Sequence, residues 1–258
     1  MFAGEIIELI ESVAPLSNQE SWDNSGLQIG QRNQQVSSAL LCIDVTEDVV
    51  DEAIENNCQM IVSHHPLLFK GLKRISSETY IERCVLKIIR HGLVVYSAHT
   101  SIDKYRSGVS GKMAERLGIC NYSVLSPYNA EVGLGVIGDL PQPLTITDFL
   151  ELLKDAFHTS VIRYLPSFVD SDNILRVAMC GGAGSEFLPD AIGQGAQAYV
   201  SADFKYHEFF NSDGRISVFD IGHFESEQHT KELFYELLAD KIKCIKATKD
   251  VCQIKTFI

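Results

Sequence analysis

The sequence is short of positive charge, and this shortage excludes one class of partner. Its 258 residues include 22 Lys and Arg against 34 Asp and Glu, which gives a net charge of −12. Proteins that bind DNA or RNA without regard to base sequence depend on Lys and Arg contacts to phosphate. We therefore expect no nucleic-acid partner, although bound metal ions can create a local positive site in an acidic protein.

Long apolar runs are also missing. No stretch approaches the roughly 20 apolar residues that a membrane-spanning helix needs. The opening residues, MFAGEIIELIESVAPL, mix acids with apolar residues and contain no basic segment, so they predict an amphipathic helix rather than a signal peptide. We therefore expect a cytoplasmic protein with no membrane partner.

Closely spaced cysteines are the third absence. Seven cysteines are present, but no two form a CxxC pair, and most stand beside apolar residues. This pattern indicates buried, reduced thiols rather than disulfides or a zinc knuckle. The rest of the composition is ordinary for a globular protein, with 45% hydrophobic and 22% charged residues.

Apolar, strand-like runs alternate with helical patterns in the first half of the chain. Thr46 is placed to cap one helix and Gly92 to end another. The β-α-β-α order predicts a mostly parallel sheet with helices on its faces. The expected strands are 39–45, 59–63 and 93–98, and the expected helices are 3–13, 46–57, 77–92 and 109–118.

A stretch rich in turns, glycine and proline predicts a boundary near residue 128. A second α/β set follows it, and strands within 243–248 and 253–258 are expected to close the second sheet. We therefore predict an α/β protein of two domains, residues 1–128 and 129–258, with mixed, largely parallel sheets and a metal site in the cleft between them.

Four of the strand-like runs end in polar residues that can bind ligands. Two lie in the first half, MIVSHHP and VVYSAHTSID, and two in the second, AYVSADFKYH and VFDIGHFESE. Ligand sites in open α/β sheets gather beyond the carboxyl ends of the strands. The residues at these four strand ends are therefore the candidates for a ligand-binding site.

Histidine, aspartate and glutamate at these ends are typical ligands of first-row divalent metals. The candidates are His64, His65, His99, Asp103, His223, Glu225 and Glu227. Adjacent residues in an extended chain point to opposite sides, so two neighbouring histidines suit two different ions. Two ions about 3.5–4 Å apart can activate a water between them, and a carboxylate such as Asp103 or Glu227 is the natural bridge.

The acid that accompanies His223 depends on where the next helix begins. An extended chain would put His223 and Glu225 on one side. A helix would instead bring together His223 and Glu227, four residues apart, and Glu225 would then favour the helix N-terminus.

Other motifs have simpler interpretations. We interpret His91, His158 and His229 as structural residues. CGGAGS (180–185) predicts a tight turn rather than a nucleotide fingerprint, because it is neither a full GxGxxG nor a P-loop. The loop at Trp22, Asp23 and Asn24 suggests a hydrogen-bonded segment near the site, but burial of the indole is the simpler account. Two roles are open for Asp203, Tyr206 and His207. They could support the metal ligands or contact a substrate, or they could cap the following helix.

Six blocks in this order resemble the Nif-three-like dinuclear metal-centre family, whose members are called GTP cyclohydrolase type 2 homologues. They are SWDNSGLQIG, SHHPLLFKG, SAHTSID, CGGAGS, SADFKYH and GHFESE. The resemblance covers nearly the whole chain, in the short form without an inserted domain. It departs from the family pattern at Ser101, Ile102, Ser201 and Ala202, and none of these is a ligand position.

The resemblance implies five metal ligands, two divalent ions per chain and a toroidal homohexamer. The ligands it implies are His64, His65, Asp103, His223 and Glu227. It favours Glu227 over Glu225. The ions suit Zn, Fe, Mn, Ni or Co, among which the residues do not choose.

Two functions are compatible with these residues. The first is a metal-dependent hydrolase of a small molecule, with His99 or His207 as acid or base; the family label implies the nucleotide GTP. The second is a non-catalytic metal-binding scaffold or metal-handling protein that acts through partners. A closed ligand set favours the scaffold, and an open coordination position favours the hydrolase.

Overall fold

The computed structural model describes residues 1–168 and 173–255, and they form two compact units. The first unit contains Met1–Ile102 and Thr230–Val251. The second unit contains Asp103–His229 and the residues from Cys252 onward. The chain thus passes from the first unit to the second after Ile102, and not near residue 128. It returns to the first unit for the late segment Thr230–Val251.

The first unit is built on one five-stranded sheet. Its strand order is β1-β4-β3-β2-β11, and all neighbours are parallel except β1 and β4. The strands are β1 (Gly26–Ile29), β2 (Ser38–Cys42), β3 (Met60–Ser63), β4 (Val94–Ser97) and β11 (Lys243–Lys246). The helices are α1 (Ala3–Glu11), η1 (Leu16–Asn18), α2 (Glu47–Glu55), α3 (Tyr80–Arg90) and α9 (Thr230–Leu238).

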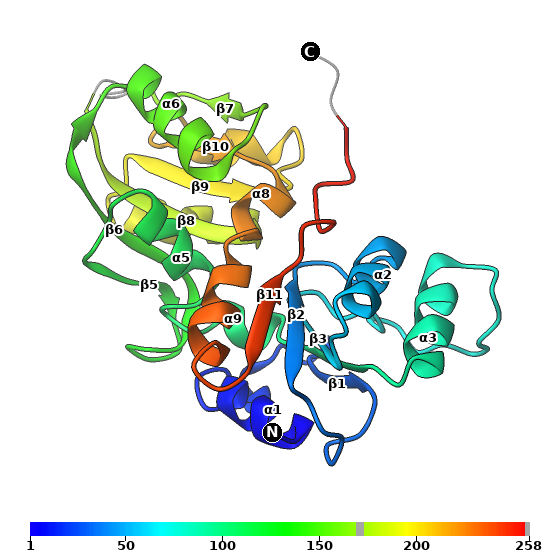
Figure 1. Ribbon diagram of the computed structural model, residues 1–258. Helices are drawn as coiled ribbons and strands as arrows, with labels where there is room; N and C mark the ends of the chain where they lie inside the picture. Colours follow the sequence, from blue (N-terminus) through cyan, green and yellow to red (C-terminus); the bar gives the residue numbers. More distant parts are fainter. Residues whose placement is uncertain (169–172, 256–258) are drawn as a thin grey trace. The chain divides into compact units, whose positions relative to one another are not determined.

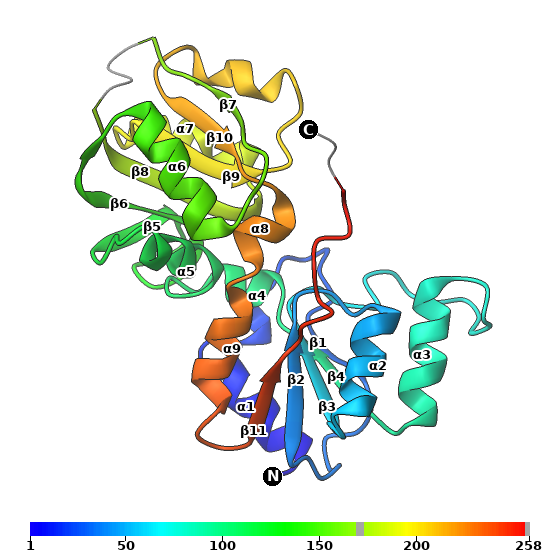
Figure 2. The ribbon, with the colours of Figure 1, turned by 45° about the horizontal axis from the view of Figure 1, so that its top comes forward.

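The expectation that 243–248 closes the second sheet is wrong. Strand β11 pairs in parallel with β2, with Lys243 opposite Ser38 and Lys246 opposite Leu41 (Figure 2). Both are short strands with apolar interiors, and local pattern does not say which sheet such a strand joins. The other segment expected to close the sheet, 253–258, ends outside the described residues, and its described part contains no strand.

Helices cover both faces of the first sheet, with α2 and α3 on one side and α1 and α9 on the other (Figure 2). Alternating strand residues supply the two faces, so that Leu40, Ile61 and Val95 pack on the α2–α3 side. Thr46 caps α2, accepting a hydrogen bond from the backbone N–H of Val49, and Gly92 follows α3 with φ +63°. The cap at Thr46 and the helix end at Gly92 are both as the sequence predicts.

The second unit is built on a six-stranded mixed sheet. Its order is β5-β6-β8-β9-β10-β7, with parallel pairing only across β8-β9-β10. The strands are β5 (Tyr122–Pro127), β6 (Gly133–Leu144), β7 (Arg163–Leu165), β8 (Ile174–Ala183), β9 (Ala198–Ala202) and β10 (Ser217–Asp220). The helices are α5 (Val109–Arg116), α6 (Ile146–Phe157), η2 (Ser185–Phe187), α7 (Leu188–Gly193), η3 (Glu208–Ser212) and α8 (His223–Glu227), and α4 (Thr100–Asp103) lies at the division between the units.

Strands β8, β9 and β10 lie side by side in this sheet (Figure 1), and two apolar layers cover it. Met113 of α5 and Phe149 of α6 pack on one face, and Leu188 of α7 packs on the other. Neighbouring residues of β10 divide between the layers, Phe219 into the first and Val218 into the second. The prediction of two α/β domains with mixed sheets is thus confirmed. None of the helices in the described part of the chain is long and apolar enough to cross a membrane.

Candidate functional site

Three histidines gather at one edge of the first sheet. Strands β3 and β4 are parallel neighbours with Ser63 opposite Ser97, so the residues that follow them leave the sheet at the same edge. The ring of His64 lies 4.8 Å from that of His65 and 5.4 Å from that of His99, and His65 and His99 are also 5.4 Å apart. Parallel pairing therefore brings together two motifs whose first residues, Ser63 and Ser97, are 34 positions apart in the sequence.

Both members of the histidine doublet are oriented through Nδ1. The Nδ1 of His64 lies 3.0 Å from the carbonyl oxygen of Ala98, and the Nδ1 of His65 lies 2.9 Å from a carboxylate oxygen of Asp44. Because these oxygens accept, each Nδ1 carries the hydrogen, and the neutral ring keeps its lone pair on Nε2. This is the arrangement of metal-binding histidines, which hydrogen-bond through the nitrogen away from the metal.

His99 is oriented by Asp23 from the loop between η1 and β1. The Nδ1 of His99 lies 2.7 Å from one oxygen of Asp23, whose other oxygen accepts hydrogen bonds from the backbone N–H and hydroxyl of Thr100 and from the hydroxyl of Ser25. Burial raises the pKa of Asp23, but hydrogen bonds from His99, Thr100 and Ser25 outweigh it and leave the pKa well below its usual range. Asp23 is therefore a carboxylate that holds His99 in one orientation.

The loop around Asp23 is hydrogen-bonded, as the sequence suggested, but its tryptophan is not buried. The Trp22 side chain is 59% exposed. Its indole lies with its edge toward the rings of Phe69 and His99, both at 6.0 Å. The simpler interpretation, burial of the indole, is wrong because the side chain is exposed.

In the second unit, His223 and Glu227 share one face of the short helix α8. The Nε2 of His223 lies 3.2 Å from Oε2 of Glu227, as the spacing of four residues predicts. Glu225 points elsewhere: its carboxylate lies over Gly222, at the start of the helix. The helical interpretation, rather than the extended one, therefore describes this segment.

Asp203 orients His223 as Asp44 orients His65. Asp203 follows β9 in the left-handed conformation, with φ +58°, and its Oδ2 lies 2.7 Å from Nδ1 of His223. Burial by itself lowers the pKa of His223, but the charges of Glu227 and Asp203, with hydrogen bonds to both, raise it to about 11. The hydrogen bond from His223 in turn lowers the pKa of Asp203. His223 thus lies between two carboxylates.

Gly182 in CGGAGS makes room for Glu227. It has φ +65°, and a Cβ at this position would lie 2.3 Å from Oε1 of Glu227 and 3.3 Å from Cε1 of His223. Its N–H donates to the hydroxyl of Ser226, and that of Gly181 donates to the hydroxyl of Ser110. Gly182 is therefore needed for the close approach of α8, and the N–H groups of both glycines already have partners inside the unit.

Asp103, the last residue of α4, lies in the same unit as Glu227. Both carboxylates act on Cys180, where burial first and then the charges of Asp103, Glu186 and Glu227 hold the pKa well above its usual range. Both acids are therefore near the Cys180 thiol. A thiol with so high a pKa stays protonated in the absence of a metal ion, and that no cysteine is a ligand stays a prediction.

The remaining histidines lie away from these clusters or use the other nitrogen. His207 contacts the rings of Tyr206 and Phe210 in the loop after β9. His229 uses Nε2 toward the carbonyl oxygen of Ala156, and His91 and His158 end helices α3 and α6. These features agree with structural roles for His91, His158 and His229.

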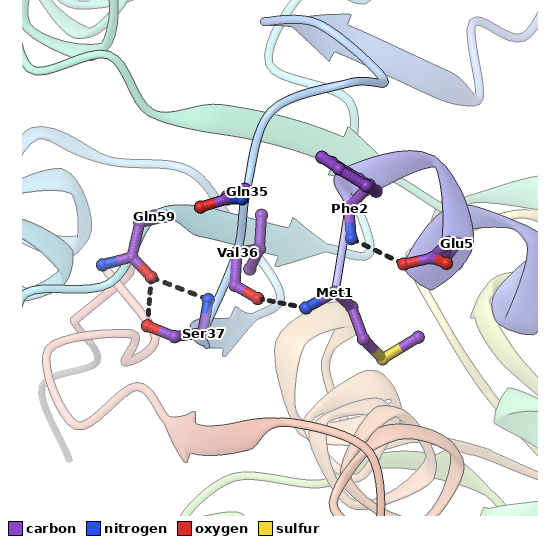
Figure 3. Close-up of a pocket in the computed structure, with 7 residues that line it drawn as sticks. All are labelled: Met1, Phe2, Glu5, Gln35, Val36, Ser37 and Gln59. Atoms are coloured by element: carbon purple, nitrogen blue, oxygen red, sulfur yellow. Dashed lines mark hydrogen bonds between the residues drawn. The ribbon is translucent and has the colours of Figure 1, made fainter.

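A separate pocket of about 510 Å³ opens in the first unit, and Figure 3 shows it. No predicted site residue lines it. Its polar groups bond to one another: the Met1 amino group donates to the carbonyl oxygen of Val36, and the hydroxyl of Ser37 donates to Oε1 of Gln59. The lining residues are Met1, Phe2, Glu5, Gln35, Val36, Ser37 and Gln59.

Sequence reasoning missed Asp44 and the roles of Asp23 and Gly182. Asp44 is the next-to-last residue of the strand-like run ALLCIDV, so a carboxylate near a strand end was the available signal. For Gly182 the signal was only a pair of glycines, which a simple turn explains equally well.

Comparison with known proteins places the chain in a family. Relatives from Clostridium acetobutylicum and Clostridium perfringens, both called GTP cyclohydrolase 1 type 2 homolog, are 34% and 33% identical to it. The first alignment covers 86% of this chain and 84% of the relative, and the second covers 88% and 87%. Each is similar over nearly its whole length.

Solved structures with a similar fold match the whole chain. A Staphylococcus aureus hypothetical protein matches this chain with a TM-score of 0.90 and 25% sequence identity. A Bacillus cereus protein related to NIF3 matches it with a TM-score of 0.89 and 23% sequence identity. Each comparison covers 100% of this chain and 99% of the other. The family description Duf34/NIF3 (NGG1p interacting factor 3) matches residues 1–256, which confirms the resemblance of the sequence motifs. The chain therefore belongs to the Duf34/NIF3 family.

Proposed function

We propose that this protein is a metal-dependent hydrolase that binds two divalent ions. The proposed ligands are His64 and His65 from the first unit and Asp103, His223 and Glu227 from the second. One observation carries the proposal. All three histidines are held through Nδ1 by an oxygen acceptor, respectively Ala98, Asp44 and Asp203. His99, the proposed acid or base, is held in the same way by Asp23, whereas His229 uses Nε2.

The donor set fits divalent metals. Imidazole nitrogens and carboxylate oxygens suit Zn, Fe, Mn, Ni and Co, and five ligands exceed the four of one tetrahedral site. Two ions bound by this set would supply an activated water at neutral pH and would polarise an oxygen of the substrate. Glu227 is the proposed bridge, because it is buried and its carboxylate already contacts His223.

His99 is the proposed acid or base. Asp23 fixes the hydrogen on Nδ1 and stabilises the positive ring, so Nε2 is the atom that takes up and returns a proton. The His99 side chain is 16% exposed, which allows contact with a substrate, and its ring lies beside those of His64 and His65. His207 remains a second candidate from the other unit.

The proposed substrate is a small molecule, and the names of the relatives suggest a nucleotide such as GTP. We also carry forward the toroidal homohexamer implied by the resemblance, which sedimentation of the purified chain tests. If the chain binds two ions but hydrolyses no nucleotide or phosphoester, the metal-binding scaffold becomes the better description.

The test compares two neighbouring acids. Titration of metal-free protein is expected to saturate at about two ions per chain. Glu227→Ala is expected to lose most of the bound metal and any hydrolysis, because it removes the proposed bridge. Glu225→Ala should lose little of either, because its carboxylate lies toward Gly222. Metal content and circular dichroism of each variant are the measurements.

Cys180→Ser serves as a control, since its thiol is predicted not to bind metal. Saturation at one ion that needs all five residues would overturn the dinuclear assignment. The reverse ranking of the two glutamate variants would move the ligand to Glu225.

A further inference from the structure

Two exposed aromatic side chains lie beside the histidine cluster of the first unit. Trp22 is 59% exposed and Phe69 is 45% exposed, and their ring centroids are 6.0 Å apart at an angle of 61°. His99 contacts both, at 6.0 Å from Trp22 and 6.2 Å from Phe69. A single exposed aromatic needs no explanation, but a pair beside a proposed acid–base residue does.

The two loops that carry these rings are tied together through Leu68. The side-chain amide of Asn24 donates to the carbonyl oxygen of Leu68 at 2.7 Å, and the N–H of Leu68 donates to Oε1 of Gln28 at 3.2 Å. Asp23, between Trp22 and Asn24, is held by Thr100 and Ser25. The rings are therefore positioned before any ligand arrives, which lowers the entropy cost of binding.

Positive charge follows Phe69 directly in the chain. Lys70, Lys73 and Arg74 are exposed in the loop between β3 and α3, and within residues 1–168 and 173–255 none of them forms an ion pair. By contrast, Arg83 and Lys87 of the following helix pair with Glu47 and Asp51. In a chain of net charge −12, three such cations in one loop indicate an anionic ligand.

We propose that Trp22 and Phe69 form a stacking surface for the planar ring of a nucleotide, whose phosphates bind Lys70, Lys73 and Arg74. This rests on the proposed function, and it assigns the part of the site that holds the ring. Aromatic side chains stack on any base, whereas phosphate needs cations, so the two features together select a ligand that has both. An exposed ring that three exposed cations follow in the same loop makes a poor core for an interface between copies, where charge is depleted.

Trp22 is the only tryptophan, so fluorescence excited at a wavelength that tryptophan absorbs and tyrosine does not reports this surface alone. GTP and ATP are expected to quench it with similar affinity, because stacking does not distinguish bases. Inorganic triphosphate, which lacks the ring, and guanosine, which lacks the phosphates, should each bind about tenfold more weakly or worse.

Matched variants separate the ring from the charges. Phe69→Ala should weaken GTP binding about tenfold, and Phe69→Tyr should retain it. Tyr235→Ala, which removes a 42% exposed aromatic from α9 of the same unit, should change nothing. Replacing Lys70, Lys73 and Arg74 by Ala should weaken binding and flatten its salt dependence, whereas the same number of charges removed at Arg90, Lys241 and Lys243 should not.

Two outcomes overturn the proposal. The first is that GTP does not quench Trp22, or that Phe69→Ala leaves the quenching unchanged. If such protein still binds metal and hydrolyses its substrate, the proposed function stands without this surface. The other is dissociation of an oligomer by Phe69→Ala in sedimentation, which would make the surface an interface between copies. Quenching that responds to these variants in a chain that binds no metal supports the stacking surface and overturns only the hydrolase.

Discussion

Each histidine proposed as a ligand is paired with an oxygen that lies far from it in the sequence. His65 meets Asp44, His223 meets Asp203, and His64 meets the backbone of Ala98. A carboxylate at Nδ1 both fixes the tautomer and makes the ring a better donor to a metal. At the residue scale, these pairs make the candidate site more than a cluster of polar groups.

Gly182 gives a residue-scale prediction. Gly182→Ala places a methyl group 2.3 Å from the Glu227 carboxylate, at a backbone φ of +65°. The strain should lower the free energy of unfolding by roughly 1–3 kcal/mol and displace Glu227, so that metal affinity falls about tenfold or more. Urea unfolding and metal titration are the two measurements.

Gly193→Ala is the matched control. Gly193 lies in α7 with nothing within 4 Å of the added methyl group, so this change should leave metal affinity unaltered and stability equal or slightly higher. Unchanged metal affinity in Gly182→Ala would show that Glu227 tolerates displacement and is not a ligand.

At the scale of elements, the segment after β11 is clamped to the first sheet by two buried acids. Glu52 of α2 accepts hydrogen bonds from the N–H groups of Thr248 and Lys249 and from the hydroxyl of Thr248. Asp250 accepts from the N–H of Ile43, beside the strand end that carries Asp44. The clamp thus connects the late segment to the residue that orients His65.

Glu52 predicts how stability depends on pH. Burial raises its pKa, but hydrogen bonds from Thr248 and Lys249 lower it overall, so the charged form is favoured in the folded protein. Its contribution is therefore complete above the unfolded pKa of about 4.3 and is lost as pH falls through the lower folded value. Glu52→Gln should destabilise the protein at pH 7 and should differ progressively less from wild type below about pH 4.3.

Urea unfolding of both proteins between pH 3 and pH 7 measures this difference. Glu55→Gln is the control, since Glu55 only pairs with Lys249 at the surface and its loss should change stability little. A constant difference between Glu52→Gln and wild type across this range would contradict the ionised clamp.

At the scale of the whole molecule, the first unit is discontinuous in sequence. The late segment Thr230–Val251 returns to it and supplies α9 and β11. Strand β11 covers the edge of β2, and α9 buries Phe234 and Leu238. Without this segment, an apolar strand would lose its parallel neighbour and one sheet face would lose part of its cover.

Fragments test this division. Residues 1–128 alone should fail to unfold cooperatively, whereas residues 1–102 joined by a flexible linker to residues 230–251 should do so, because the joined fragment restores the edge strand and the covering helix. Residues 103–229 should fold separately. Circular dichroism during urea unfolding measures each fragment, and cooperative unfolding of residues 1–128 would favour a boundary at residue 128.

By itself, the sequence determined the α/β class and the strand ends that carry the candidate residues, and it narrowed the partner of His223 to Glu225 or Glu227. Each of these depends on a local period, two residues in a strand or about four along a helix, which is readable in any short window. Only the tertiary structure decided that Asp44, Asp23 and Asp203 orient histidines, that Gly182 makes room for Glu227, and that β11 joins β2. These contacts depend on strand order and on close approach between segments distant in the chain, and no local pattern encodes either.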